Sequence, residues 1–174
     1  NFFSSSGKKL LTPSGVEIMK ERLLPLAHLV TPNIREAEIL SGIKIRMLAD
    51  RKRAARKILK LGVRAVVITG GHLKGNPEDL YLDNNGFENL NSKRLSQSDP
   101  HGTGCVYSSA ITAGLALGRQ TLLAVKDAKE FISLKSLTEN KSIKVVKNLK
   151  NSSVFFAVKY FFMSNLFFQI ISYY

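Results

Sequence analysis

The sequence has few cysteines, and the second part of the chain has no helix breakers. Cys105 is the single cysteine, which excludes an internal disulfide and a cysteine-based zinc cluster and favours a reducing compartment. All twelve glycines and all five prolines lie at or before Gly118. The opening "NFFSSSGKKLL" lacks the charged and then apolar pattern of a secretory leader. We therefore expect a cytoplasmic protein.

The composition is that of a globular protein with a strong excess of positive charge. Apolar residues make up 44% and charged residues 22% of the 174 residues, which suits one ordinary domain with a sizeable core. The formal net charge of +13 favours a polyanionic partner, whether a nucleic acid, an anionic membrane or a small phosphate. Charge alone does not choose among the three.

The end of the chain differs in composition from the rest, and we place a boundary between a domain at 1–135 and a tail at 136–174. Residues 154–174 contain six of the ten Phe and three of the five Tyr. This stretch is long enough to cross a bilayer, but Lys159, Asn165 and Gln169 near its middle would make insertion costly. A buried or aggregating β-rich segment is the alternative. We expect no membrane contact outside this tail.

Helices and strands are predicted to alternate before the tail, as they do in an α/β fold. Thr12 and Pro13 suit a helix start, Gly42 and Gly62 suit helix ends, and "VRAVVIT" is a β-branched strand. An Asn85-Gly86 turn is predicted to join two short strands. The predicted helices are 13–25, 36–40, 48–61, 102–117 and 121–132, and the predicted strands lie at 28–32, 63–69 and on either side of the Asn85-Gly86 turn.

The stretch "HGTGC" (101–105) opens a predicted helix with two glycines separated by one residue. Unpaired N–H groups and the helix dipole at such a start favour an anion such as phosphate, and a cysteine in the first turn would be a base or a nucleophile. A glycine-rich helix start followed by a buried, inert cysteine explains the residues equally well. The pattern is neither a Walker A loop nor a dinucleotide fingerprint, since G-x-G-x-x-G is broken at Tyr107.

Two further motifs follow predicted strands. In "TPNIREAE", Asn33 and Glu36 lie three apart, so they either bring an amide and a carboxylate together near a hydrated magnesium ion or, as we favour, form a capping box. In "ITGGH", Thr69, Gly70 and Gly71 stand at a strand end, where open α/β sheets bind ligands, although an ordinary turn is equally consistent. Together, the three motifs are placed as a nucleotide-phosphate site requires.

Six positive charges lie between Arg51 and Lys60 on a predicted amphipathic helix. They would suit a nucleic-acid backbone, but the segment has no interleaved aromatic residues and no known nucleic-acid-binding motif. We therefore favour a solvated helix face and expect no nucleic-acid partner.

The stretches "LLPLAHLVTPNIREAEILSG", "AVVITGGHL" with the following "DLYLD", and "HGTGCVYSSAITAGLALG" resemble, in order and spacing, the C-terminal half of hydroxymethylpyrimidine phosphate kinases of thiamine biosynthesis. These enzymes belong to the ribokinase-like superfamily. The resemblance runs from about residue 5 to residue 131. It implies an α/β fold with a ribokinase-like sheet flanked by helices, ATP and Mg²⁺ as cofactors, and a small pyrimidine as substrate.

The resemblance also implies roles for individual residues. Gly102, Thr103 and Gly104 would form the anion hole around the transferring phosphate, and Cys105 would stand in for the superfamily's usual aspartate base. Asn33 and Glu36 match its N-x-x-E element, which positions magnesium and phosphates. Thr69 and Gly71 would contact ATP. Many pyrimidine kinases have a lysine at the position of Thr69.

The resemblance further implies that the family's N-terminal half, with its Gly-rich substrate-binding segment and first strands, is missing, and that the tail replaces the family's usual ending. The expected function is ATP-dependent phosphorylation of hydroxymethylpyrimidine or its monophosphate, impaired in a fragment. The alternatives are a catalytically inactive nucleotide-binding remnant and a basic nucleic-acid-binding protein. An incomplete sheet with an open edge also favours pairing with a second copy.

Overall fold

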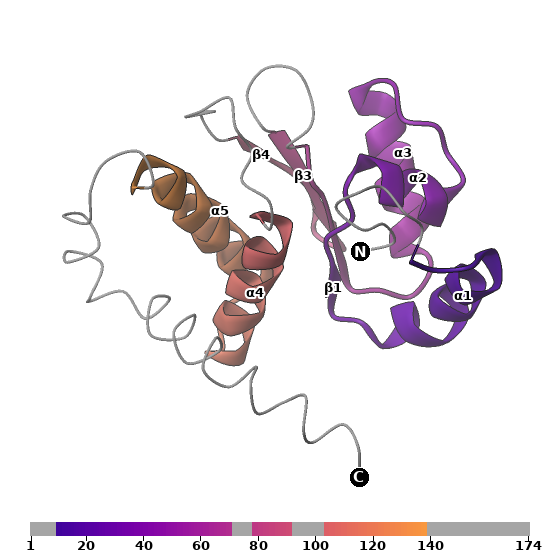
Figure 1. The fold of residues 1–174 in the computed structure, drawn as a ribbon, viewed down its shortest axis with the longest axis horizontal. Helices are drawn as coiled ribbons and strands as arrows, with labels where there is room; N and C mark the ends of the chain where they lie inside the picture. The colour runs from indigo at the N-terminus through magenta and orange to yellow at the C-terminus, as the bar shows by residue number, and fades with distance from the viewer. Residues whose placement is uncertain (1–9, 71–77, 92–102, 139–174) are drawn as a thin grey trace, which may run out of the picture. The chain divides into compact units, whose positions relative to one another are not determined.

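The computed structural model describes residues 10–70, 78–91 and 103–138, of which 103 and 134–138 are described in backbone only. Figure 1 shows their helices and strands. The residues fall into two compact units, one within 1–93 and one within 94–174. In the described residues, no helix combines the length and the apolar character that crossing a membrane requires.

The first unit combines helices with a four-stranded sheet. Its helical elements are α1 (Pro13–Ile18), the π-helical turn η1 (Met19–Leu23), the 3-10 turn η2 (Leu24–Leu26), α2 (Ile34–Ser41) and α3 (Leu48–Leu59). Its strands are β1 (Leu29–Val30), β2 (Ala65–Ile68), β3 (Glu78–Asp83) and β4 (Gly86–Asn91). The sheet order is β1-β2-β3-β4, in which β1 and β2 are parallel while β2–β3 and β3–β4 are antiparallel. This mixed sheet with helices confirms the predicted α/β class.

The residues at the ends of α1 and α2 explain where these helices start and stop. Thr12 caps α1 by accepting a hydrogen bond from the Gly15 N–H at 3.1 Å, and Pro13 occupies the first helical turn, where no N–H is needed. Gly42 ends α2 with φ of 66°, the left-handed conformation that glycine adopts without strain. The predicted start of α1 and the predicted end of α2 are confirmed, whereas the predicted helix 13–25 is α-helical only to Ile18 and continues as η1 and η2.

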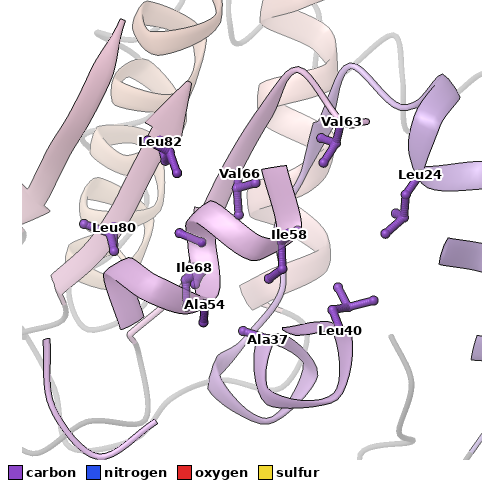
Figure 2. Packing of buried hydrophobic residues seen from close by; sticks show 11 residues of the cluster. Leu24, Ala37, Leu40, Ala54, Ile58, Val63, Val66, Ile68, Leu80 and Leu82 are labelled. Atoms are coloured by element: carbon purple, nitrogen blue, oxygen red, sulfur yellow. The ribbon is translucent and has the colours of Figure 1, made fainter. Parts of the chain in front are cut away.

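The core of this unit lies between the sheet and the helices α2 and α3. Figure 2 shows Ala37 and Leu40 of α2 and Ile58 of α3 gathered with Val66 and Ile68 of β2 and Leu80 of β3. Ala37, Ile58, Val66, Ile68 and Leu80 have no exposed surface. Burying a large aliphatic side chain contributes about 1.5–3 kcal/mol, so this cluster is the main source of stability that the structure describes in the first unit.

The charged residues of α3 do not all lie on a solvated face. Arg51 is only 5% exposed, and its Nη1 donates to the Glu78 carbonyl of β3 at 2.9 Å. Lys52 and Arg56 lie over the Phe87 ring of β4, at 5.5 and 4.8 Å from its centroid. The placement of Arg51 on the solvated side is therefore wrong, because its guanidinium is buried and donates to a carbonyl of β3.

The second unit is a pair of helices, α4 (Thr103–Ala116) and α5 (Thr121–Thr138). A Cβ built on Gly114 would lie 3.0 Å from the Cβ of Ala124, so α4 and α5 approach each other too closely here for a larger side chain. Ala110, Ile111 and Val125 are buried in the same unit. Gly114 therefore allows the close contact between α4 and α5.

The loop of the β3–β4 hairpin and the extent of α5 differ from the sequence-based expectation. The hairpin register pairs Asp83 with Gly86, so its two-residue loop is Asn84-Asn85, with Gly86 already in β4 at φ of 129°. Helix α5 begins at Thr121, continues to Thr138, and has its first turn closed by the Ala124 N–H on the Gln120 carbonyl. The helix thus continues past its predicted end at Ile132, and residues 139–174 of the predicted tail lie outside the described residues.

The turn from α3 to β2 generates a prediction for Gly62. This residue has φ of 98°, and an added Cβ would lie 2.9 Å from the backbone Cα of Pro25. We expect Gly62→Ala to lower the free energy of unfolding by about 2–4 kcal/mol, because it combines an unfavourable φ with a backbone clash. Gly42→Ala is the matched control: it has φ of 66° and only the Lys57 Nζ within 4 Å, at 3.8 Å. Urea unfolding measures both variants, and an equal loss of unfolding free energy in the two would show that the clash with Pro25 contributes nothing.

A second prediction concerns Glu38, whose Oε2 accepts from the Lys44 Nζ at 2.8 Å and whose Oε1 accepts from the Ile45 N–H at 2.9 Å. The bond from Lys44, and then that from Ile45, lower the pKa of Glu38 below its ordinary value of 4.5. Since the folded state favours the ionised carboxylate, its contribution is present above pH 4.5 and is lost as pH falls through the lowered pKa. The free energy of unfolding, measured from neutral to acid pH, should fall less in Glu38→Gln than in the unchanged chain. An identical pH dependence in the two proteins would show that Glu38 does not contribute to the acid loss of stability.

Candidate functional site

The parallel strands β1 and β2 end side by side, and their ends carry two of the predicted site residues. Beyond the regular pairing, the Thr69 N–H donates to the Pro32 carbonyl at 2.9 Å, and Asn33 and Thr69 form an isolated parallel bridge. The structure therefore brings Asn33 and Thr69 together at the carboxyl edge of this strand pair. This edge is where open α/β sheets bind ligands.

Asn33 and Glu36 form a reciprocal capping box at the start of α2. The Asn33 Oδ1 accepts from the Glu36 N–H at 2.9 Å, and the Glu36 Oε2 accepts from the Asn33 N–H at 3.1 Å. Glu36 is only 6% exposed. The capping interpretation favoured from the sequence is confirmed. The same oxygens are engaged by backbone donors, so they suit contact with a hydrated magnesium ion through its water molecules better than direct ligation.

Asp79 of β3 is a residue that the sequence analysis missed. It is 2% exposed, and its Oδ1 accepts a hydrogen bond from the Gly70 N–H at 2.9 Å. Asp79 thus holds the backbone directly after Thr69. A signal was present in "DLYLD", because an acidic residue next to three apolar or aromatic residues in a strand needs a polar partner.

Tyr81, on the same strand, is buried beside a carboxylate. The Tyr81 hydroxyl donates to the Asp83 Oδ2 at 2.8 Å, and burial together with this carboxylate raises the pKa of Tyr81. Tyr81 therefore stays protonated at neutral pH. Within the described ranges, no three His, Cys, Asp or Glu side chains gather in a group able to hold a metal ion.

The first turn of α4 contains Thr103, Gly104 and Cys105. Cys105 is exposed, so the alternative of a buried, inert thiol is wrong. A Cβ on Gly104 would meet nothing within 4 Å among the described residues, so packing there gives no reason for a glycine. The Ser108 hydroxyl donates to the carbonyls of Gly104 and Cys105, each at 3.1 Å, so its hydrogen bonds are made to the backbone of its own helix.

Two predicted site residues, Gly71 and Gly102, lie outside the described residues. The others fall into two sets, since Asn33, Glu36 and Thr69 belong to the first unit, whereas Thr103–Cys105 belong to the second. The structure joins the members within the first set through the capping box and the strand bridge.

Solved structures define the class of protein. The structure of the Staphylococcus aureus pyridoxal kinase in complex with AMP-PCP is similar to this chain, with 40% sequence identity and a TM-score of 0.68. The similarity covers 71% of this chain and 46% of the kinase chain. A phosphomethylpyrimidine kinase from Clostridium difficile 630 is similar at 39% identity and a TM-score of 0.65, over 79% of this chain and 55% of that one. The fold is that of the ribokinase-like kinases, as the sequence predicted.

The sequence comparison then gives the particular family. The profile of the phosphomethylpyrimidine kinases matches residues 2–149, so the chain belongs to this family. A hydroxymethylpyrimidine/phosphomethylpyrimidine kinase of Aquifex aeolicus (strain VF5) is 44% identical over 133 residues, which are 76% of this chain and 52% of that protein. The chain spans about half the length of the curated relatives it matches.

The capping box generates a prediction for Asn33. Replacement by alanine removes the acceptor for the Glu36 N–H, so we expect Asn33→Ala to lower the free energy of unfolding by about 1 kcal/mol. Asn33→Asp is the matched control, because it keeps an acceptor oxygen at the cap. Urea unfolding of the two variants checks this, and equal stability of Asn33→Ala and the unchanged chain would disprove the cap's contribution.

Proposed function

We propose that this chain carries the nucleotide and anion-binding half of a phosphomethylpyrimidine kinase, which transfers the γ-phosphoryl group of ATP to hydroxymethylpyrimidine or its monophosphate. The observation that carries the proposal is the placement of the family's motifs. Asn33 and Thr69 meet at the ends of two parallel strands, and Thr103–Cys105 open a helix with the thiol exposed. Phosphates bind at both kinds of position.

In the proposed reaction, the substrate hydroxyl oxygen attacks the γ-phosphorus as the bond to the β–γ bridging oxygen breaks, and ADP leaves. Cys105, as the thiolate, accepts the proton of that hydroxyl. Backbone N–H groups at the start of α4, around Thr103 and Gly104, stabilise the charge on the transferring group. The sequence places Gly102 in the same anion hole.

On the side of the nucleotide, Thr69 would contact the ATP phosphates, and the sequence places Gly71 beside it. Asn33 and Glu36 would hold a hydrated magnesium ion, which neutralises charge on the phosphates when it is bound. The capping box supports this role because it orients both side chains at the strand end. A small-molecule substrate, ATP and a cytoplasmic setting together fit a kinase of vitamin biosynthesis.

Pyridoxal is the second candidate substrate. It is favoured by the likeness to the Staphylococcus aureus pyridoxal kinase, also solved in complex with AMP-PCP and pyridoxal, at 40% identity and a TM-score of 0.68. A form that binds nucleotide without transfer is the third candidate. We favour the pyrimidine because the family profile covers residues 2–149.

The test is a phosphoryl-transfer assay of the 174-residue chain with Mg-ATP and, in turn, hydroxymethylpyrimidine and pyridoxal, each of which carries the hydroxyl that the proposed step deprotonates. We expect turnover with the pyrimidine, and a decrease in kcat of about 10²–10⁴-fold in Cys105→Ala, the usual effect of losing a general base. Cys105→Asp should recover part of the loss, because a carboxylate can accept the same proton. Thr112→Ala is the matched control, since its hydroxyl donates to the Ser108 carbonyl at 2.8 Å, further along the same helix.

The possible outcomes separate the candidates. Turnover unchanged in Cys105→Ala would overturn its role as the base, and preferential turnover of pyridoxal would change the substrate. Saturable binding of Mg-ATP without turnover of either substrate would identify the nucleotide-binding form. Salt-sensitive binding of an oligonucleotide without ATP binding would instead favour the nucleic-acid alternative.

A further inference from the structure

The antiparallel pairing of β2 with β3 stops at the pair Ile68–Leu80. Continued by one step, the same register would place Thr69 opposite Asp79. Instead, the Gly70 N–H donates to the side chain of Asp79, at 2.9 Å from its Oδ1. The backbone leaving β2 is therefore held by a carboxylate of the neighbouring strand where the regular strand pairing ends.

The same strand end is held from a second direction. The Nη1 of Arg51, on α3, donates to the carbonyl of Glu78 at 2.9 Å and lies 3.8 Å from the Glu78 Oε2. The first residue of β3 is thus tied to a helix of the core, and the next residue is Asp79. This contact fixes the strand from which the carboxylate of Asp79 projects.

Asp79 needs its hydrogen bond because it is 2% exposed, and removing a carboxylate from water is unfavourable without polar partners. Hydrogen bonds to an ionised acceptor are also shorter and stronger than those between neutral groups. The bond to Gly70 therefore both satisfies Asp79 and restricts the peptide that follows Thr69. Thr69 is held on its other side by its N–H on the Pro32 carbonyl at 2.9 Å.

We propose that Asp79 is a positioning residue of the nucleotide site, which orients Thr69 and the following backbone toward the phosphates by accepting the Gly70 N–H. This inference rests on the proposed function, because it takes Thr69 as a phosphate contact. Asp79 itself does not touch the nucleotide in this arrangement. Its effect reaches the phosphates through one hydrogen bond to the backbone.

The test measures the affinity of the 174-residue chain for Mg-AMP-PCP by calorimetry, well below the melting temperature of each variant. We expect Asp79→Ala to bind about tenfold more weakly, equivalent to about 1.4 kcal/mol. Asp79→Asn should stay within about twofold, because its amide oxygen can accept the same N–H. Asp83→Ala is the matched control on the same strand, since its carboxylate bonds to Tyr81 and Asn85 rather than to Gly70.

Several results would overturn the inference. If the unchanged chain binds no Mg-AMP-PCP, the proposed function and the inference fail together. If it binds and Asp79→Ala binds equally well, only the positioning role fails, as it does if Asp79→Asn loses as much affinity as Asp79→Ala. A purely structural role would lower the melting temperature and leave the affinity unchanged.

A second measurement needs no variant and covers the case in which Asp79→Ala does not fold. In an amide NMR titration of the unchanged chain, we expect the Gly70 resonance to shift when Mg-AMP-PCP is added. The resonance of Asn85, whose N–H donates to the Asp83 Oδ1 at 2.8 Å, serves as the internal control. A Gly70 resonance that stays fixed while nucleotide binds would overturn the inference.

Discussion

The parallel pairing of β1 with β2 is the interaction on which the rest of the first unit depends. It covers only Leu29–Ala65 and Val30–Val66, and it is lengthened by the Ala65 N–H on the His28 carbonyl and the Thr69 N–H on the Pro32 carbonyl. Since the two strands run in the same direction, the segments that follow them leave the sheet at the same edge. The helix α2 starts there after β1, and Gly70, whose N–H is bound by Asp79, comes shortly after the end of β2.

The core and this edge are built from the same segments. Ala37 lies one residue after Glu36 on α2 and has no exposed surface, and Ile68 of β2 comes directly before Thr69. Packing of Ala37 and Ile68 in one cluster therefore sets the separation of the two polar segments beside them. A polar site built in this way inherits its shape from apolar packing, which tolerates changes of volume poorly.

The features that could be predicted from the sequence are those whose causes are local. The cap at Thr12, the end of α2 at Gly42 and the capping box at Asn33 each depend on residues within four positions of one another. Arg51 and Asp79 were missed or misplaced because their partners come from other elements, at Glu78 and Gly70. Periodicity assigned Arg51 to the polar face of its helix, and only the position of β3 shows why a guanidinium is buried there. The exposure of Cys105 likewise depends on packing rather than on its neighbours in sequence.

The capping box has a consequence for how tightly an anion or a hydrated cation could be held at this edge. Asn33 and Glu36 are already locked in one rotamer each by the first turn of α2, before any ligand arrives. Fixing a free, rotamer-rich side chain on binding costs about 0.5–1.5 kcal/mol. Here the side-chain entropy of Asn33 and Glu36 is lost when the chain folds, not when a ligand binds. The edge is therefore preorganised, and the flexibility of these two side chains lowers its affinity for a ligand less.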